Sequence, residues 1–181
     1  RLGTIRGIIT EVESYMGEED KGSHTYGGRH TERTEPMYHR GGTSYVYLIY
    51  GMYSCMNIAA MTEGIPQAVL IRSVVPADGE SERWMLELRL EEYNRKRLKR
   101  GKEPCEAGES GKLPASLRRQ LADGPGKLCI AMGITRADND LDMVESSTFY
   151  VTEGWETDSA RIQSGKRIGI DYAGEAAEYL W

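Results

Sequence analysis

The sequence predicts a protein of the α+β class, folded as one domain. Strand-like segments gather in the first 75 residues instead of alternating with helices, as they would in a doubly wound sheet. The chain has 181 residues, which is enough for one domain with a sizeable core. Hydrophobic residues make up 39% and charged residues 28%, a balance typical of a globular chain rather than a disordered one.

Four strands are expected first along the chain. Ile, Val and Thr partly alternate with other residues in TIRGIITEVESY, residues 4–15, as they do in strands. Three apolar runs follow at 45–50, 55–60 and 67–75, separated by the turn residues of GMYS and MTEGIP. Residues 17–44 have no sustained period, so we expect a long loop or loop-helix segment, a kind of segment that often carries function.

Helices are expected after the strands. Residues 79–100 contain one Trp and several Leu residues as apolar markers of a helix, and an exposed loop follows at 101–112. A short helix is expected over 114–121, and a further helix from Pro125 to about Gly133, because proline suits a first helical turn. Two more strands are expected in the tail, at 148–152 and 166–170.

The charges are segregated along the chain. The 23 Lys and Arg residues against 28 Asp and Glu residues give a net charge of −5, which argues against a nucleic-acid protein. No acidic residue, however, lies between Glu35 and Glu63, and the stretch from Arg95 to Arg119 holds nine bases against three acids. The acidic total therefore hides a basic stretch. A solvated surface is the alternative reading of such charge runs.

Tyrosine is used in place of phenylalanine. The chain has 11 Tyr and one Phe, and seven of the tyrosines lie in the first 53 residues. Tyrosine combines ring stacking with hydrogen bonding, so this distribution indicates a surface that recognises a planar group.

Several classes of protein are excluded by missing motifs. The longest apolar stretch, 45–50, is too short to span a bilayer. The three cysteines form no CxxC pair, which suits reduced thiols in a cytosolic compartment. The sequence also lacks an HExxH pattern, so it does not indicate a zinc site. Neither Gly111-Lys112 nor Gly126-Lys127 completes a phosphate-binding loop. Lys127 at a helix start could still hold one phosphate of a polymer, or be an ordinary surface lysine.

Polar residues interrupt segments that otherwise read as buried strands. Glu11 and Glu13 are two residues apart on a strand and therefore share a face. Arg72 is a charge within AVLIRSVV, and a Glu and an Arg on neighbouring strands could pair as structure or hold a general base in place. Asn57 interrupts CMNIAA, either as a hydrogen-bonded structural residue or as a ligand contact.

Together these residues form a polar and aromatic set near one sheet. Tyr rings stack on planar rings, a carboxylate activates water, and Asn and His read the edges of a base. This chemistry suits hydrolysis at a nucleoside whose base has been pulled from a helix. The members of the set are Glu13, Tyr15, His24, Tyr47, Tyr50, Asn57 and Arg72.

Long motifs of this chain closely resemble the alkyladenine (3-methyladenine) DNA glycosylase family. They are EVESYMGEEDKGSH, GGRHTERTEPM, YVYLIYGMYSCMNI, AVLIRSVVP, GPGKLC and RIGIDYAGE. The resemblance implies a monomeric, metal-free enzyme without cofactors. It implies one compact α+β domain over 1–181, with a curved, mostly antiparallel sheet and surrounding helices.

The resemblance also implies a reaction. Members of the family flip alkylated or deaminated purines (3-methyladenine, 7-methylguanine, hypoxanthine and ethenoadenine) out of duplex DNA. They then hydrolyse the N-glycosidic bond. The motifs contain no candidate lysine near the tyrosines for Schiff-base chemistry, so we expect an enzyme that does not cleave the strand. A DNA-repair hydrolase of this kind would lie at the nucleoid in the cytoplasm of a bacterium, or in the nucleus of a eukaryote.

Residue roles follow from the same resemblance. Glu13 matches the general base, and Arg72 the arginine that helps to position the attacking water. Tyr15 and Tyr47 match the aromatic walls around the flipped base, and His24 lies beside them. The remaining matches are Tyr50 as the wedge in the DNA stack, Asn57 as the residue that rejects guanine, and Arg29, Thr31, Met52, Tyr53 and Lys127 as DNA contacts.

Two departures from the family pattern stand out. Both ends look truncated, because family domains carry a strand and a helix before the first motif and a further strand after the last. Residues 93–119 look longer and more basic than the corresponding family loop, so they either touch DNA near the lesion or form a surface excursion. The alternative functions are a lesion-binding protein with no or weak catalytic activity and a hydrolase of free nucleosides.

Overall fold

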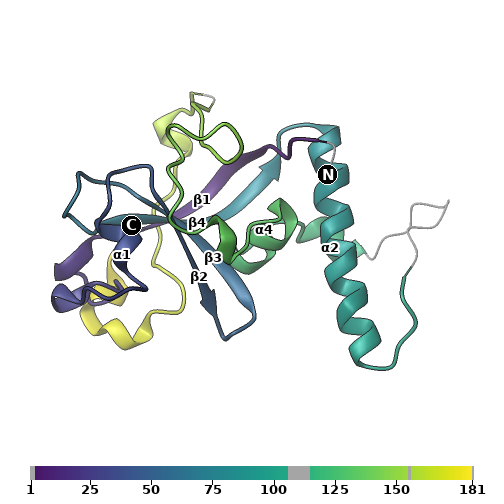
Figure 1. Ribbon diagram of the computed structural model, residues 1–181, viewed down its shortest axis with the longest axis horizontal. Helices are drawn as coiled ribbons and strands as arrows, with labels where there is room; N and C mark the ends of the chain where they lie inside the picture. Colours follow the sequence, from purple (N-terminus) through teal and green to yellow (C-terminus); the bar gives the residue numbers. More distant parts are fainter. Residues whose placement is uncertain (1–2, 106–114, 155, 181) are drawn as a thin grey trace. The chain divides into compact units, whose positions relative to one another are not determined.

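A computed structural model describes residues 3–105, 115–154 and 156–180 (Figure 1). Its centre is an open sheet of β1 (Gly7–Tyr15), β2 (Ser44–Ile49), β3 (Tyr53–Ala59) and β4 (Ala68–Pro76). The strands follow the order β1-β4-β3-β2 and the sheet is antiparallel, with Asn57 opposite Leu70 where β3 meets β4. The predicted α+β class and the four predicted strands are therefore confirmed.

Contacts along the chain divide it into two compact units. The first contains Arg1–Glu11, Leu48–Cys55 and Arg72–Ala137, and the second contains Val12–Tyr47, Met56–Ile71 and Asp138–Trp181. Each strand of the sheet contributes residues to both units. The prediction of one domain over residues 1–181 stays a prediction.

The first unit contains the longest helix. α2 (Gly79–Lys99) begins where the Asp78 carboxylate accepts a hydrogen bond of 2.7 Å from the Ser81 amide, which caps an otherwise unpaired N–H group. α2 packs against α4 (Pro125–Met132) and the short α3 (Ala115–Arg119), and Figure 1 shows α4 beside α2. The predicted helices are confirmed, whereas residues 106–112 of the expected loop, with Pro114, lie outside the described residues.

α4 ends where its sequence stops the helix. Pro125 occupies its first turn, and Gly133 follows its last residue with φ of 70°. Residues that carry a side chain rarely adopt this left-handed backbone conformation, but glycine does so without steric cost. The predicted start and end of this helix are therefore both confirmed.

The second unit contains several short helical turns. The segment expected as a long loop or loop-helix segment contains η1 (Gly17–Glu19), η2 (Tyr26–Gly28) and α1 (Glu35–Tyr38). η4 (Ser159–Arg161) and η5 (Asp171–Glu178) follow later, while η3 (Arg136–Asp138) spans the boundary between the two units in the chain. Two buried clusters hold this unit together. Met37 and Tyr45 pack with Ala68, and the η5 residues Ala173 and Ala176 pack with Ile170, next to Tyr15.

The two strands predicted in the tail are wrong. Residues 148–152 adopt no strand, and Lys166 makes only an isolated bridge to Leu180. Ile168 is 63% exposed and Val151 is 49% exposed, so their β-branched side chains do not face a packed neighbour. The Ile168 amide donates instead to a side chain, the carboxylate of Glu13. A strand propensity without a partner strand is not enough to form a sheet.

Candidate active site

Glu13 is a buried carboxylate near the end of β1. Its exposed fraction is 3%. One carboxylate oxygen accepts a hydrogen bond of 2.8 Å from the Ile168 amide, and the other accepts one of 2.8 Å from the Tyr15 hydroxyl. A buried charge is costly unless it is paired or hydrogen-bonded, and these donors supply part of that compensation. They also fix the direction in which both oxygens point.

Tyr15, the donor to Glu13, is half-buried at the last position of β1. Burial raises the pKa of its hydroxyl, and the negative charge of Glu13 and the hydrogen bond to it raise the pKa further. The hydroxyl therefore remains protonated and donates. Tyr47, which belongs to the same unit, adds to the upward shift of the pKa.

His24 lies beside these tyrosines as a neutral ring. Its Nδ1 shares a hydrogen bond of 2.9 Å with the Tyr45 hydroxyl, and its ring meets that of Tyr47 edge-on, with centroids 4.7 Å apart. Burial lowers the pKa of His24 to about 4, and the positive charges of Arg33 and Arg29 lower it as well. At neutral pH the ring has one donor and one acceptor nitrogen, which suits hydrogen bonding to a base edge or a sugar.

Tyr47 carries a second neighbour that the sequence did not indicate. The guanidinium carbon of Arg33 lies 5.0 Å from the centre of the Tyr47 ring, within the range of a cation–π contact. Arg33 lies in GGRHTERTEPM, but its position in that motif says nothing about the ring it meets.

Asn57 is almost fully buried in β3, with 4% of its surface exposed. Its side-chain amide donates a hydrogen bond of 3.1 Å to the Tyr45 carbonyl. This bond agrees with the structural alternative for Asn57. It also fixes the side chain in the unit that contains Tyr47 and His24. The role in rejecting guanine stays a prediction.

Arg72 and Glu11 form an ion pair in the first unit. Arg72 Nε donates a hydrogen bond of 3.0 Å to Glu11 Oε1, across the neighbouring strands β4 and β1. The Arg72 side chain is 11% exposed and that of Glu11 is 44% exposed. The expected pairing of a strand arginine with a strand glutamate is thus present, with Glu11 as the partner. The role of Arg72 towards Glu13 stays a prediction.

The turn between β2 and β3 exposes Tyr50, the expected wedge, and Met52, an expected DNA contact. Tyr50 is 83% exposed and Met52 is 71% exposed. Tyr50 has φ of 52°, a conformation that bulky residues rarely adopt and that commonly marks functional positions. A tyrosine held outward at the tip of a two-strand turn has the size and position of a side chain that enters a base stack.

Two further expected DNA contacts in the first unit are held by polar neighbours. The Tyr53 hydroxyl accepts a hydrogen bond of 2.8 Å from Lys96, whose ammonium also pairs with Glu92 at 2.6 Å. Lys127, the third residue of α4, donates a hydrogen bond of 2.9 Å to Gln120. Both residues are therefore positioned by side chains of the same unit.

The other two expected DNA contacts belong to the second unit. Arg29 and Thr31 lie in the exposed loop that follows η2. The Arg29 carbonyl accepts a hydrogen bond from Thr34, and the Thr31 amide donates one of 2.9 Å to the Thr34 hydroxyl. Thr34 is buried, so it anchors the loop while the two predicted contacts stay exposed.

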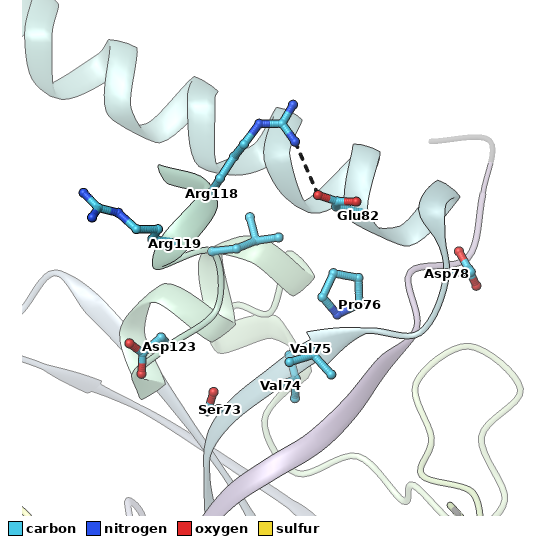
Figure 2. A pocket seen from close by; sticks show the side chains of 10 residues that line it. Ser73, Val74, Val75, Pro76, Asp78, Glu82, Arg118, Arg119 and Asp123 are labelled. Atoms are coloured by element: carbon cyan, nitrogen blue, oxygen red, sulfur yellow. Dashed lines mark ion pairs between the residues drawn. The ribbon is translucent and has the colours of Figure 1, made fainter. Parts of the chain in front are cut away.

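A cavity of about 410 Å³ lies in the first unit, and none of the residues that line it is among those predicted for the site (Figure 2). Its lining mixes both signs of charge. Arg118 pairs with Glu82 at 3.5 Å, and Asp78 and Asp123 lie around it. This mixture favours neither an anion nor a cation, so the cavity does not indicate a class of ligand.

Of the helices within residues 3–105, 115–154 and 156–180, none is long and apolar enough to cross a membrane. Over the same ranges, no group of three or more His, Cys, Asp or Glu side chains could hold a metal ion.

Comparison with known proteins places this chain in a family. The family model described as methylpurine-DNA glycosylase (MPG) matches residues 1–181. A relative from Clostridium acetobutylicum is 43% identical over 175 residues, which cover 97% of this chain and 76% of the relative. One from Bacillus cereus is 40% identical over 179 residues, covering 97% and 77%. Both carry the curated name "Putative 3-methyladenine DNA glycosylase". The match over the whole chain shows that this protein belongs to the methylpurine-DNA glycosylase family, whose substrate partner is DNA.

Proposed function

We propose that this protein excises alkylated or deaminated purines from duplex DNA by hydrolysis of the N-glycosidic bond. The substrates proposed are 3-methyladenine, 7-methylguanine, hypoxanthine and ethenoadenine. The observation that carries the proposal is the Glu13 carboxylate, which is buried and held through both oxygens, one of them by the hydroxyl of the aromatic residue Tyr15. This is the arrangement that a fixed general base beside a base-binding pocket requires.

Glu13 is the general base in the proposed reaction. The carboxylate accepts a proton from water while the water oxygen forms a bond to C1′ of the deoxyribose. The bond from C1′ to the base nitrogen breaks, and its electron pair leaves with the base. The transition state resembles an oxocarbenium ion, so a nearby carboxylate also stabilises its charge. The proposed product is an abasic site in an uncut strand, since the mechanism uses no Schiff-base lysine.

The aromatic rings bind the flipped base. Tyr15 and Tyr47 offer electron-rich faces, which attract a positively charged purine such as 3-methyladenine. Neutral hypoxanthine and ethenoadenine lack that attraction, so edge contacts must select them. His24 is neutral at physiological pH and supplies such contacts without repelling a cationic base.

The wedge and the DNA contacts complete the proposal. Tyr50 takes the place of the flipped nucleotide, and Asn57 crowds the 2-amino group of guanine. Arg29, Thr31, Met52, Tyr53 and Lys127 contact the backbone or a groove. We propose that the protein acts as a monomer. Because the relatives reported above are bacterial, the proposed location is the nucleoid in a bacterial cytoplasm.

Substitution of Glu13 tests the proposal. We expect Glu13→Gln to reduce single-turnover excision from duplexes containing each of the four lesions by about 100-fold or more, the range of a lost general base. Binding to the same duplexes should change little, since glutamine keeps the size of the side chain. The matched control is Glu82→Gln in α2, which should excise at the parental rate.

The outcome also separates the alternatives. Full excision by Glu13→Gln contradicts the general-base role. A parental protein that binds lesion duplexes but releases no base is a lesion-binding protein. A protein that hydrolyses free nucleosides but leaves duplexes intact is the other alternative, in which Tyr50 has no function.

A further inference from the structure

Arg167 and Asp20 form a buried ion pair that the proposed reaction does not use. The Arg167 side chain is 0% exposed and that of Asp20 is 3% exposed. The guanidinium donates to both carboxylate oxygens, at 2.5 Å and 2.8 Å, in the two-pronged geometry that arginine forms with a carboxylate. The two residues are 147 positions apart in the chain and lie in the same unit.

The ion pair joins three segments of the second unit. Arg167 donates to the Ser14 carbonyl in β1 at 3.0 Å and to the Ala176 carbonyl in η5 at 3.2 Å. Asp20 accepts hydrogen bonds from the amides of Met16 and Gly22, which closes the loop after β1. The end of β1, this loop and the C-terminal segment are therefore connected through one pair of charges.

These segments carry the candidate catalytic groups. The Arg167 guanidinium carbon lies 4.8 Å from the centre of the Tyr15 ring, so a cation covers one face of that ring. The next residue, Ile168, supplies the amide that donates to Glu13 at 2.8 Å. Arg167 thus contacts Tyr15 directly and reaches Glu13 through the adjacent peptide group.

The local packing leaves Arg167 little freedom. A methyl group added at Gly22 would lie 3.0 Å from the guanidinium and 3.1 Å from Ile170. The loop after β1 therefore approaches the C-terminal segment as closely as glycine permits.

Stability alone does not account for this pair. Burial of two charges is expensive, and replacement of a buried ion pair by apolar side chains of similar volume is often neutral or stabilising. The geometry points to another use. We propose that the Arg167–Asp20 pair is a positioning device for the candidate active site, which orients Tyr15 for base stacking and holds the Ile168 amide against Glu13. This inference rests on the proposed function, because it assigns the pair a task in that same site.

Four variants test the inference. Arg167→Met removes the charge and keeps most of the volume, Arg167→Lys keeps the charge without the planar fork, and Asp20→Asn keeps the size of the carboxylate. Met85→Ala is the matched control, since Met85 is fully buried in α2 and is no part of the proposed site. Excision is measured as a single-turnover rate constant per folded molecule, with saturating protein.

The rate constants should separate positioning from stability. We expect Arg167→Met to lower the rate constant by about 10- to 100-fold, the scale of a small misplacement of reacting groups. Arg167→Lys should recover only part of the rate, since lysine cannot form the two-pronged contact. Met85→Ala should be less stable and keep the parental rate.

A readout independent of activity distinguishes this inference from the proposed function. The nuclear magnetic resonance signal of the Ile168 amide reports its hydrogen bond to Glu13, and it should move upfield in Arg167→Met. It should remain in place in Met85→Ala. If the parental protein excises no lesion but this signal moves, the proposed function fails and the positioning role stands. If Arg167→Met does not fold, the same two measurements are made on Asp20→Asn. A parental rate together with a parental Ile168 signal in a folded Arg167→Met or Asp20→Asn variant overturns the inference.

Discussion

At the residue scale, the chemistry of the site depends on side chains whose neighbours set their protonation. Tyr15 remains a donor because burial and the adjacent Glu13 raise its pKa. Asp20 remains charged although burial alone would raise its pKa, because hydrogen bonds from Arg167 and from the backbone lower it on balance. His24 is the opposite case, since burial removes its charge at neutral pH. One small region therefore holds a neutral phenol, a neutral imidazole and a buried ion pair.

The lowered pKa of His24 predicts a dependence of stability on pH. The unfolded chain binds a proton at this histidine below its ordinary pKa of about 6.5, whereas the folded protein does not until about pH 4. The contribution of His24 to the free energy of unfolding is therefore complete above the unfolded pKa and is lost as the pH falls from about 6.5 towards 4. We expect roughly 1–3 kcal/mol from this histidine alone.

Urea unfolding at several pH values measures this effect. The parental protein should lose stability between pH 6.5 and pH 4.5 more steeply than His24→Gln. Met85→Ala should be weaker by a constant amount and keep the parental slope. Equal slopes for the parent and His24→Gln would show that His24 is not held neutral.

Asn57 offers a second residue-scale prediction. Replacement of Asn57 by alanine removes the proposed steric barrier to the guanine 2-amino group, so excision of undamaged guanine from duplex DNA should increase. The Tyr45 carbonyl also loses its donor, which should cost about 1–3 kcal/mol of unfolding free energy. Guanine release by high-performance liquid chromatography and urea unfolding measure the two effects. An unchanged guanine rate in a folded variant counts against the proposed selectivity.

At the element scale, the turn between β2 and β3 is shaped for exposure rather than for stability. Tyr50 and Gly51 both have positive φ, 52° and 66°, and the Met52 amide closes the turn on the Ile49 carbonyl at 3.1 Å. Glycine tolerates this backbone, but tyrosine is strained by it. An exposed aromatic residue at a strained position indicates that the sequence places function above local stability here.

Tyr50→Gly should therefore change stability and activity in opposite directions. Relief of backbone strain should keep or raise the free energy of unfolding, by up to about 1 kcal/mol. Loss of the wedge should lower excision and weaken binding to lesion duplexes. Tyr26→Gly, at another exposed tyrosine, is the control for the loss of a surface ring and should leave excision unchanged. Parental excision by Tyr50→Gly would remove the wedge from the proposed mechanism.

At the scale of the whole molecule, the net charge of −5 is a poor guide to the partner. The acids are concentrated towards the C-terminus, while the window from Glu35 to Glu63 and the basic stretch near residue 100 leave local surfaces for phosphate. Affinity for a DNA lesion depends on such local contacts together with the flipped base, so a modestly acidic total does not oppose it.

Binding to an abasic-site duplex should therefore weaken as salt rises. Phosphate contacts release counterions, so the logarithm of the binding constant should fall linearly with the logarithm of salt concentration. Lys127→Gln should reduce that slope by about 1, the effect of one lost phosphate contact. Lys166→Gln, whose lysine pairs with Glu178, is the control and should keep the parental slope. Binding that does not respond to salt would contradict the DNA contacts.

The sequence by itself determined the four strands of the sheet and the helices, and it singled out candidate site residues. Alternating and apolar runs gave β1 to β4, Pro125 and Gly133 bounded α4, and polar interruptions of strands marked Glu13, Asn57 and Arg72. These features depend on near neighbours in the chain, because side-chain period, turn residues and helix ends act over a few positions.

Only the tertiary structure decided which distant groups meet. It paired Arg72 with Glu11, placed Arg33 over Tyr47 and left the tail without the two expected strands. It also buried Arg167 against Asp20, 147 residues away, and brought the Ile168 amide to Glu13. The physical reason is that such contacts depend on how whole segments pack, and no local period in a sequence records which charge will lie against which.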